Sequence, residues 1–399
     1  MSDTAFVAGF RSLEEELTDN HLPLDGSIPP WLSGKLLRNG PGAFEGGGER
    51  MAHWFDGLSM LRKYTFADGE VRYSNRFLRT ESYDAAMAGN LSGQFATDER
   101  GLEKVLGWLR RLGPPEPTDN ANVHVARLNG EFVALTEVPR WVRFDDETLA
   151  TPGEFVFQDL ETHHMITAHL VDDPHRGEHV GHALTFGRTH EYRLFRIPQG
   201  TKRREEIAAI PADDPAYVHS VGVSEDHVVL VETPLRIDIL QAVSPFSEGL
   251  FEMLEWHPDR ETTVYVVSRD TGNVVTQTTA APFFTFHTVN AFDDSGDVVV
   301  DLIAFEDEQI VNALALDGLA ERGTAREFWE RNLYIEEPCV VQHPDAEAED
   351  NGVVLAPALD VAAEQSLLLC FDATTLSELG RARVPHAIPF GFHGRFFRE

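Results

Sequence analysis

The chain has 399 residues, 42% of them apolar, and carries 66 acidic and 33 basic residues for a formal net charge of −33. This length supports a large hydrophobic core, and we expect a single domain over residues 1–399. The sequence has no basic stripe to release counterions, which argues against nucleic acid as a partner. The two cysteines, Cys339 and Cys370, do not make a disulfide framework.

The N-terminal segment has no basic region followed by an apolar stretch, and no run of ~18 apolar residues occurs in the sequence. We therefore expect a cytoplasmic protein, with at most peripheral contact with a membrane. The acidic charge has two interpretations. Its spread along the whole chain favours a cytoplasm of molar salt, where charges are screened within ~3 Å, over ordinary solubility.

Pairs of alternating apolar runs joined by tight polar turns recur along the chain. The turns contain the Asp, Asn and Gly that hairpins require, and period-two alternation predicts strands. Such hairpins are expected at residues 61–78, 124–138, 264–279 and 367–384.

Two segments have helical patterns instead, at residues 98–112 and 244–255. Their apolar stripes are typical of packing against a core. The alternative is a surface that dips into a membrane and admits an apolar substrate.

The order of these elements favours an all-β fold. A βαβ rhythm and a glycine-rich phosphate loop are both missing from the sequence, which disfavours a Rossmann fold. Many antiparallel hairpins without an obvious linker suggest one closed body, and a β-propeller satisfies this because radial repetition leaves only short edges exposed. A pair of β-sandwiches is the alternative.

Four of the 17 histidines interrupt or end apolar, strand-like runs. They are His169 in ITAHLV, His219 in AYVHSVGV, His287 in FFTFHTVNAF and His393 in FGFHGRFF. Burying an imidazole among apolar side chains is unfavourable unless its nitrogens find partners. One such histidine is usually a satisfied core residue. Four, separated by 50, 68 and 106 residues, suit a site where different strands meet on a propeller axis.

The same segments carry a resemblance. The chain resembles the carotenoid cleavage oxygenase family, and the matching motifs follow the family's order along nearly the whole chain. They lie at residues 34–60, 118–125, 135–137, 167–174, 217–235, 286–294, 336–360 and 384–394.

This resemblance implies a seven-bladed β-propeller with a cap of helices and loops over the metal axis. It implies one Fe(II), held by His169, His219, His287 and His393, with O2 as co-substrate. Ligand chemistry alone does not name the metal, because imidazole also suits Zn, Cu and Ni.

The resemblance also assigns residues around the ligands. Glu137 and Glu337 match glutamates that accept N–H bonds from ligand histidines, which fixes the ring orientation and offsets part of the metal charge. Without the resemblance, both would be interpreted as surface ion-pair partners. Thr136 matches a threonine close to the metal. Phe55 either seals a strand end or lines a substrate tunnel.

The sequence departs from the family between His287 and Glu337, where it is far shorter than usual. The glutamate that the family supplies from this stretch has no convincing match, although Glu306, Glu327 and Glu330 lie there. We therefore expect either that the propeller closes differently here or that one blade is incomplete.

The resemblance implies a dioxygenase that cleaves a C=C bond of a carotenoid or apocarotenoid to two carbonyl products, with a stilbene-like alkene as the second substrate class. No Ser-His-Asp set or paired carboxylates are evident, and none is needed. The alternatives are a non-catalytic family member that binds carotenoid or metal, and an isomerase.

Overall fold

The computed structural model describes residues 5–46, 49–90, 117–239, 253–316, 332–348 and 350–398. Strands dominate these residues, and every strand pair is antiparallel. The helices are short: η1 (Ala5–Phe10), η2 (Trp54–Asp56), α1 (Glu81–Met87) and α4 (Gln309–Ala313). Among the described residues, no helix has the length and apolarity needed to cross a bilayer.

The first two sheets come mainly from the N-terminal part of the chain. The first sheet has the order β1-β8-β7-β3-β31, with β4 beside β7, and consists of β1 (Asn20–His21), β3 (Gly34–Arg38), β4 (Pro41–Ala43), β7 (Leu58–Ala67), β8 (Glu70–Phe77) and β31 (Gly394–Arg398). The second has the order β12-β11-β10-β9 and consists of β9 (His124–Leu128), β10 (Glu131–Leu135), β11 (Val142–Phe144) and β12 (Gly153–Glu154).

The next two sheets follow in chain order. The third has the order β13-β15-β16-β17, with β14 beside β15, and consists of β13 (Met165–Ile166), β14 (Val171–Asp173), β15 (Glu178–Thr185), β16 (His190–Pro198) and β17 (Glu205–Ala212). The fourth has the order β18-β19-β22-β23 and consists of β18 (Gly222–Val223), β19 (His227–Glu232), β22 (Thr262–Ser268) and β23 (Val274–Ala280).

The fifth sheet has the order β2-β30-β29-β28-β26, with β27 beside β28. Its strands are β2 (Leu24–Gly26), β26 (Leu333–Ile335), β27 (Cys339–Gln342), β28 (Gly352–Asp360), β29 (Gln365–Asp372) and β30 (Glu378–Arg383). Three two-stranded pairs complete the described strands: β5–β6 (Glu45–Gly46, Glu49–Arg50), β20–β21 (Leu235–Ile237, Leu254–Trp256) and β24–β25 (Thr288–Asp294, Asp297–Leu302).

The four predicted hairpins are confirmed as β7–β8, β9–β10, β22–β23 and β29–β30. Their turns follow from residue chemistry. Asp68 and Gly69 have φ of 52° and 79°, and Asn129 and Gly130 have 49° and 79°. Positive φ at both central positions is the geometry that matches the twist of a two-residue hairpin.

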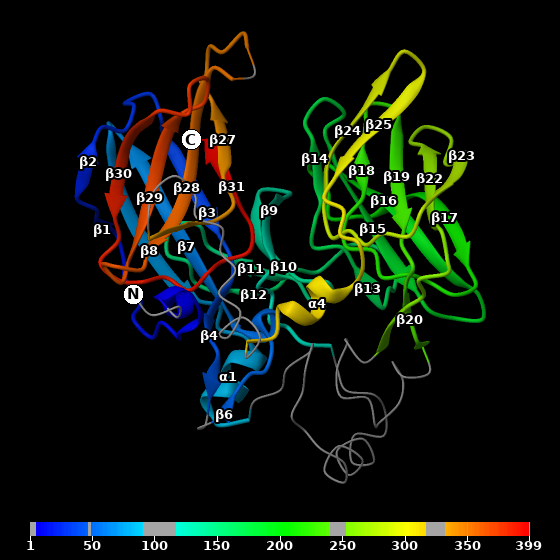
Figure 1. Cartoon of the computed structure of the whole chain (residues 1–399), viewed down its shortest axis with the longest axis horizontal. Helices are drawn as coiled ribbons and strands as arrows, with labels where there is room; N and C mark the ends of the chain where they lie inside the picture. The colour runs from blue at the N-terminus through cyan, green and yellow to red at the C-terminus, as the bar shows by residue number, and fades with distance from the viewer. Residues whose placement is uncertain are drawn as a thin grey trace.

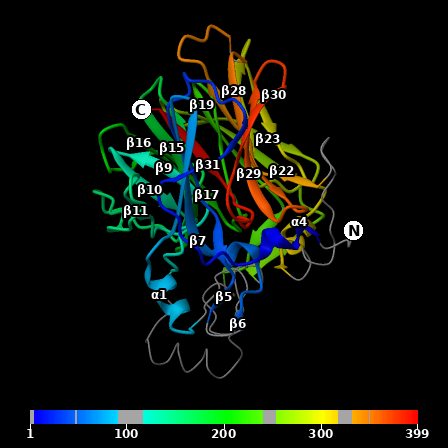
Figure 2. The same cartoon turned by 90° about the vertical axis from the view of Figure 1, so that its left-hand side faces the viewer.

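Both ends of the chain are tied into sheets formed by distant segments. β31 pairs with β3, and β2 pairs with β30, so the ends of the chain complete two different sheets. The first and fifth sheets lie on one side of the molecule and the third and fourth on the other, with β9–β12 between them (Figure 1). The helix α1 and the β5–β6 pair lie at one end, below the sheets (Figure 2).

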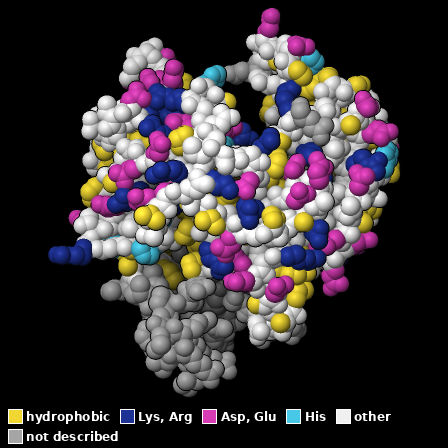
Figure 3. All heavy atoms as spheres, turned by 180° about the vertical axis from the view of Figure 1, so that it is seen from behind, with side chains coloured by type: hydrophobic (Ala, Val, Ile, Leu, Met, Phe, Trp, Pro, Cys, Tyr) yellow, Lys and Arg dark blue, Asp and Glu magenta, His cyan; other side chains and the backbone are white. Residues whose placement is uncertain are grey.

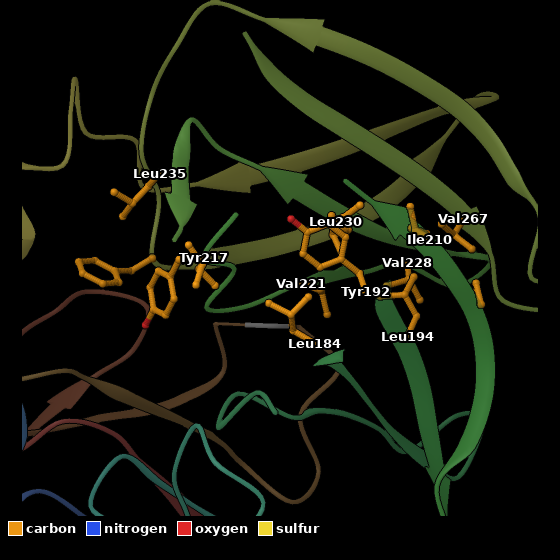
Figure 4. Packing of buried hydrophobic residues seen from close by; sticks show 14 of the residues in the cluster. Leu184, Tyr192, Leu194, Ile210, Tyr217, Val221, Val228, Leu230, Leu235 and Val267 are labelled. Carbon is orange, nitrogen blue, oxygen red and sulfur yellow. The ribbon is translucent and has the colours of Figure 1, made fainter. Parts of the chain in front are cut away.

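The largest hydrophobic cluster packs the third sheet against the fourth. Leu194 and Tyr192 of β16 meet Val228 and Leu230 of β19, all of them at most 1% exposed (Figure 4). Burial at ~25 cal/mol per Å² of apolar surface makes such contacts between neighbouring sheets the main stabilising term. Tyr217 lies at the margin of this cluster, beside Leu235 (Figure 4).

The short segment between His287 and Glu337 contains a sheet of only two strands in the described residues. Within the described residues, a two-stranded β24–β25 hairpin stands where a full blade is expected, and the sheets do not close a seven-bladed ring. Large apolar side chains are exposed on two strands, Val289 (66%) and Phe292 (42%) on β24 and Val340 (60%) on β27. The surface is hollowed between the lobe with β24–β25 and the lobe with β27–β28, at the top of Figure 3.

Neither of the two predicted helices is confirmed in the described residues. Residues 98–112 lie outside the described residues. Most of 244–255 does too, but Leu254 and Glu255 belong to β21, so the helix prediction is wrong at that end. β21 pairs with β20, and this pairing outweighs the helical spacing of the sequence.

Candidate metal centre

Each of the four predicted histidine ligands lies one to three residues before a strand. His169 precedes β14, His219 precedes β18, His287 precedes β24 and His393 precedes β31. These strands belong to four different sheets, so residues far apart in sequence reach a common point.

The four imidazoles converge. Each contributes one ring nitrogen to a group whose nitrogens all lie within 4.8 Å of one another. Ring centroids lie 4.4 Å apart for His169–His219, 4.5 Å for His169–His393, and 5.0 Å for His169–His287, His219–His287 and His287–His393. His219 is buried and the other three are half-buried.

Two of the ring nitrogens lack hydrogen-bond partners in the described residues, which suits them to bind a metal ion. The Nε2 atoms of His169 and His287 are buried and have no hydrogen-bond partner among the described residues, a state that costs ~1–3 kcal/mol per group. Burial, followed by the nearby rings of His219 and His393, lowers the pKa of His287 to about 3. The pKa of His169 is also lowered, chiefly by burial. Neutral imidazoles with free nitrogens are the form that binds a metal.

Glu137 holds the ring of His219. The Nδ1–H of His219 donates to Oε1 of Glu137 at 2.6 Å, and both side chains are only 7% exposed. The hydroxyl of Tyr217 donates to Oε2 of the same glutamate at 2.8 Å. A donor at Nδ1 fixes the tautomer that leaves Nε2 free for a metal.

Glu337 does the same for His393, with a cation as its second partner. The Nδ1–H of His393 donates to Oε1 of Glu337 at 2.8 Å, and Nη1 of Arg38 donates to Oε2 at 2.7 Å. Burial alone would raise the pKa of Glu337, but the hydrogen bond from His393 and the charge of Arg38 outweigh it, and the pKa falls to about 2. The carboxylate therefore stays ionised at neutral pH.

Two hydroxyls link the backbones of neighbouring histidines in this group. The hydroxyl of Thr167 donates to the carbonyl of His219 and accepts from the backbone N–H of His169, both at 2.9 Å. The hydroxyl of Ser220 donates to the carbonyl before His287 and accepts from the N–H after it, both also at 2.9 Å. Hydrogen bonds thus fix the spacing of the three segments that carry His169, His219 and His287.

His287 differs from His219 and His393. Within the described part of the chain, no carboxylate is hydrogen-bonded to its ring. Glu306 is exposed, and the other two acidic candidates from the shortened stretch, Glu327 and Glu330, lie outside the described residues.

The two remaining predicted site residues lie close to the ligands in the chain or in space. Thr136 is buried directly before Glu137, and its carbonyl accepts from the indole of Trp141 at 2.9 Å. Phe55, in η2, has its ring centroid 6.3 Å from Phe286 and 5.3 Å from the ring of the residue before His393. The roles at the metal and in a tunnel remain predictions.

Three residues around the centre were missed by the sequence reasoning. Tyr217 could have been found, since it stands two positions before His219, a spacing that puts side chains on one side of an extended chain. Arg38 gave a weaker signal, as a charged end to the apolar run of β3.

The third missed residue, His124, gave no signal that separated it from the other histidines. It begins β9, and its ring centroid lies 5.7 Å from His169 and 5.5 Å from His393. Burial first, and then the nearby His393, lower its pKa to about 3.

Separate antiparallel sheets bring four histidines to one point, where their ring nitrogens could hold a metal ion, and this arrangement defines the class of protein as an all-β protein with a candidate four-histidine metal centre. The sequence matches the family described as retinal pigment epithelial membrane protein (RPE65) over residues 10–329 and 319–398. The chain belongs to this family of carotenoid oxygenases.

Named relatives agree with this assignment. The chain is 29% identical over 375 residues to the β,β-carotene 15,15'-dioxygenase of Rattus norvegicus, covering 85% of this chain and 64% of the relative. It is 25% identical over 512 residues to the mitochondrial carotenoid-cleaving dioxygenase of Macaca fascicularis, covering 93% and 90%. The chain thus spans less than two thirds of the rat enzyme.

Solved structures show the same fold. A Glu150Gln mutant of the apocarotenoid oxygenase from Synechocystis superposes with a TM-score of 0.85 at 22% identity, covering 100% of this chain and 99% of that one. A cobalt-substituted form of that enzyme superposes with a TM-score of 0.84 at 22% identity, again over 100% and 99% of the two chains. The predicted all-β propeller class is confirmed by these neighbours.

Proposed function

We propose that this chain is an Fe(II)-dependent dioxygenase that cleaves a C=C bond of a carotenoid or apocarotenoid. One observation carries the proposal: four imidazoles from four sheets converge, and two of them are hydrogen-bonded to glutamates, Glu137 and Glu337. The names of the relatives support the substrate class, and the cobalt-substituted neighbour supports a metal at this kind of centre.

His169, His219, His287 and His393 would hold the iron, and bound iron supplies the O2 activation that no side chain offers. The chain's own groups orient the imidazole rings and exclude water from the site. Glu137 and Glu337 keep Nδ1 of their histidines protonated, so that Nε2 faces the metal. A metal held only by these four histidines would keep room for exchangeable groups, as a reaction between O2 and an alkene requires.

Aromatic rings form the apolar surroundings of the site. Phe286 has its ring centroid 5.3 Å from His219, and the ring of Phe55 packs on it at 6.3 Å. Phe392 packs on Phe55 at 5.3 Å and on Trp54 at 4.7 Å. An apolar polyene loses no hydrogen bonds on entering such surroundings, whereas water does, so we propose that these rings position the substrate.

The reaction balances without a protein nucleophile: the C=C bond and one O2 become two carbonyl groups. The test is to load the purified protein with Fe(II) under anaerobic conditions and then add an apocarotenal and O2. We expect visible absorbance to fall, with two shorter carbonyl products formed per polyene consumed. An unchanged spectrum at full iron loading would contradict the proposal.

A second candidate, a carotenoid- or metal-binding protein without catalysis, is favoured by the lack of a carboxylate partner for His287 in the described residues and by the two-stranded β24–β25 pair. Bound polyene with unchanged length and geometry would support that candidate. A polyene of unchanged length but altered double-bond geometry would indicate an isomerase.

A further inference from the structure

Arg38 is a buried cation next to one of the candidate ligands, and its contacts all lead to that ligand. The residue is 2% exposed. Its Nη1 donates to the carboxylate of Glu337 at 2.7 Å, and its Nη2 donates to the carbonyl of Phe392 at 3.1 Å. Phe392 precedes His393 in the chain, so one guanidinium holds both the acceptor of the imidazole and the backbone that carries it.

Glu336 extends this contact network by one residue. Its Oε2 accepts from the backbone N–H of Gly391 at 2.8 Å and lies 3.7 Å from Nη2 of Arg38. The two adjacent glutamates thus have separate tasks: Glu336 holds the main chain two residues before His393, and Glu337 holds its ring. Arg38 joins them.

The backbone around His393 is also fixed by Asn39, which directly follows Arg38 in the chain. The N–H of Phe392 donates to the carbonyl of Asn39 at 3.0 Å, and the N–H of Asn39 donates to the carbonyl of His393 at 2.9 Å. A Cβ atom at Gly394 would overlap the side chain of Arg38, and one at Gly391 would lie 3.0 Å from Glu336. The glycines on both sides of Phe392 and His393 therefore let the guanidinium and the carboxylate approach.

A lysine at position 38 would not replace these contacts. A guanidinium presents several N–H donors in a rigid plane, whereas an ammonium on a flexible stem acts as a point charge. Two Arg38 nitrogens serve a carboxylate and a carbonyl on different segments, with Glu336 in reach of the second nitrogen. The geometry thus uses the fork of arginine as well as its charge.

We propose that Arg38 and Glu336 are positioning residues for His393: together they set its backbone and hold Glu337 where the ring needs an acceptor. This inference rests on the proposed metal centre and adds residues outside its ligand set. Because the role is geometric, it predicts that keeping the charge at position 38 does not preserve the centre.

The test uses Co(II) as probe on the full-length apoprotein at fixed salt. Arg38→Lys keeps the positive charge but loses the fork. We expect its Co(II) affinity to fall ~10-fold or more, as the loss of an outer partner typically causes. We also expect its visible d–d bands to shift, because the field of the ligands changes. Glu336→Gln should change both readouts in the same direction and by less.

Arg204 offers a matched control. It is buried, donates to the carboxylate of Asp159 at 2.5 Å and to the carbonyl of Glu161 at 2.6 Å, and contacts no ligand histidine in the described residues. Arg204→Lys should lower the melting temperature of the apoprotein and leave the Co(II) affinity and bands unchanged.

Wild-type affinity and bands in Arg38→Lys, with only a lower melting temperature, would overturn the positioning role. If Arg38→Lys does not fold, unchanged affinity and bands in Glu336→Gln overturn it instead. No Co(II) binding by the wild type would overturn the proposed metal centre itself, and the positioning role with it.

Discussion

Replacing Glu137 with glutamine should weaken metal binding at the candidate centre. The substitution keeps the shape of the side chain and removes its negative charge. An amide can still accept from Nδ1–H of His219, with its NH2 group turned to Tyr217, whose hydroxyl then becomes the acceptor. The packing therefore survives, and the change isolates the charge that stands 2.6 Å from the ligand ring.

The magnitude follows from that contact. Both side chains are 7% exposed, so little solvent screens the pair. Hydrogen bonds to charged groups contribute about 1.5–3 kcal/mol, and loss of an outer partner of a ligand typically costs about 10–100-fold in affinity, or about 1.4–2.8 kcal/mol. Because the amide retains the hydrogen bond, we expect the lower end of this range, about tenfold.

The assay is competition for Co(II) or Fe(II) against a chelator of known affinity, at constant high salt. Glu232→Gln is the matched control, because Glu232 is also buried and accepts from a tyrosine, Tyr192, at 3.1 Å, without touching a histidine in the described residues. It should lower the melting temperature and leave the metal affinity unchanged. Equal metal affinities in wild type, Glu137→Gln and Glu232→Gln would refute the reasoning.

Two further variants probe the surroundings of the centre. Tyr217→Phe removes the second donor to Glu137 and should lower the metal affinity by less than Glu137→Gln does; an affinity loss as large as in Glu137→Gln would contradict this ranking. His53 has its pKa lowered to about 4, mainly by burial. The His53 imidazole therefore takes up a proton at higher pH in the unfolded chain than in the folded chain. The free energy of unfolding decreases as the pH falls from about 6.5 towards 4. His53→Asn should reduce the loss of unfolding free energy between pH 7.5 and pH 5 by about 2 kcal/mol in the apoprotein, measured by urea denaturation, and an identical pH dependence in both proteins would contradict it.

The strands of this fold could be read from the sequence because their pattern is local. Alternation sets which side chains face the core, and Asp68–Gly69 and Asn129–Gly130 supply the positive φ that closes each turn. The residues just before β21 have helical spacing, yet β21 pairs with β20. Pairing across sequence is a tertiary interaction, and local propensity does not encode it.

The candidate centre was predictable in part. The four histidines were found because a polar ring in an apolar run is costly without a partner. Their convergence needed the family resemblance, since separations of 50 residues or more carry no geometry. Arg38 was missed because its partners lie 299 and 354 residues away, at Glu337 and Phe392, and the pairing of β3 with β31 brings these segments together.

A change in the ring between His287 and Glu337 was anticipated from length alone, but its consequence for the strands was not. The sequence does not show that β24–β25 would stand as a pair with Val289 and Phe292 exposed. Which apolar side chains are exposed depends on contacts between distant segments, and no local pattern records those contacts.

Iron content tests the central claim most directly. We predict close to one iron per chain in the wild-type protein after anaerobic loading and gel filtration, and little in His287→Ala, which removes one of the four converging rings. His190→Ala, a histidine of β16 outside this group, should bind as much iron as the wild type. Full iron loading in His287→Ala, or none in the wild type, would contradict a shared metal site built from these four strand ends.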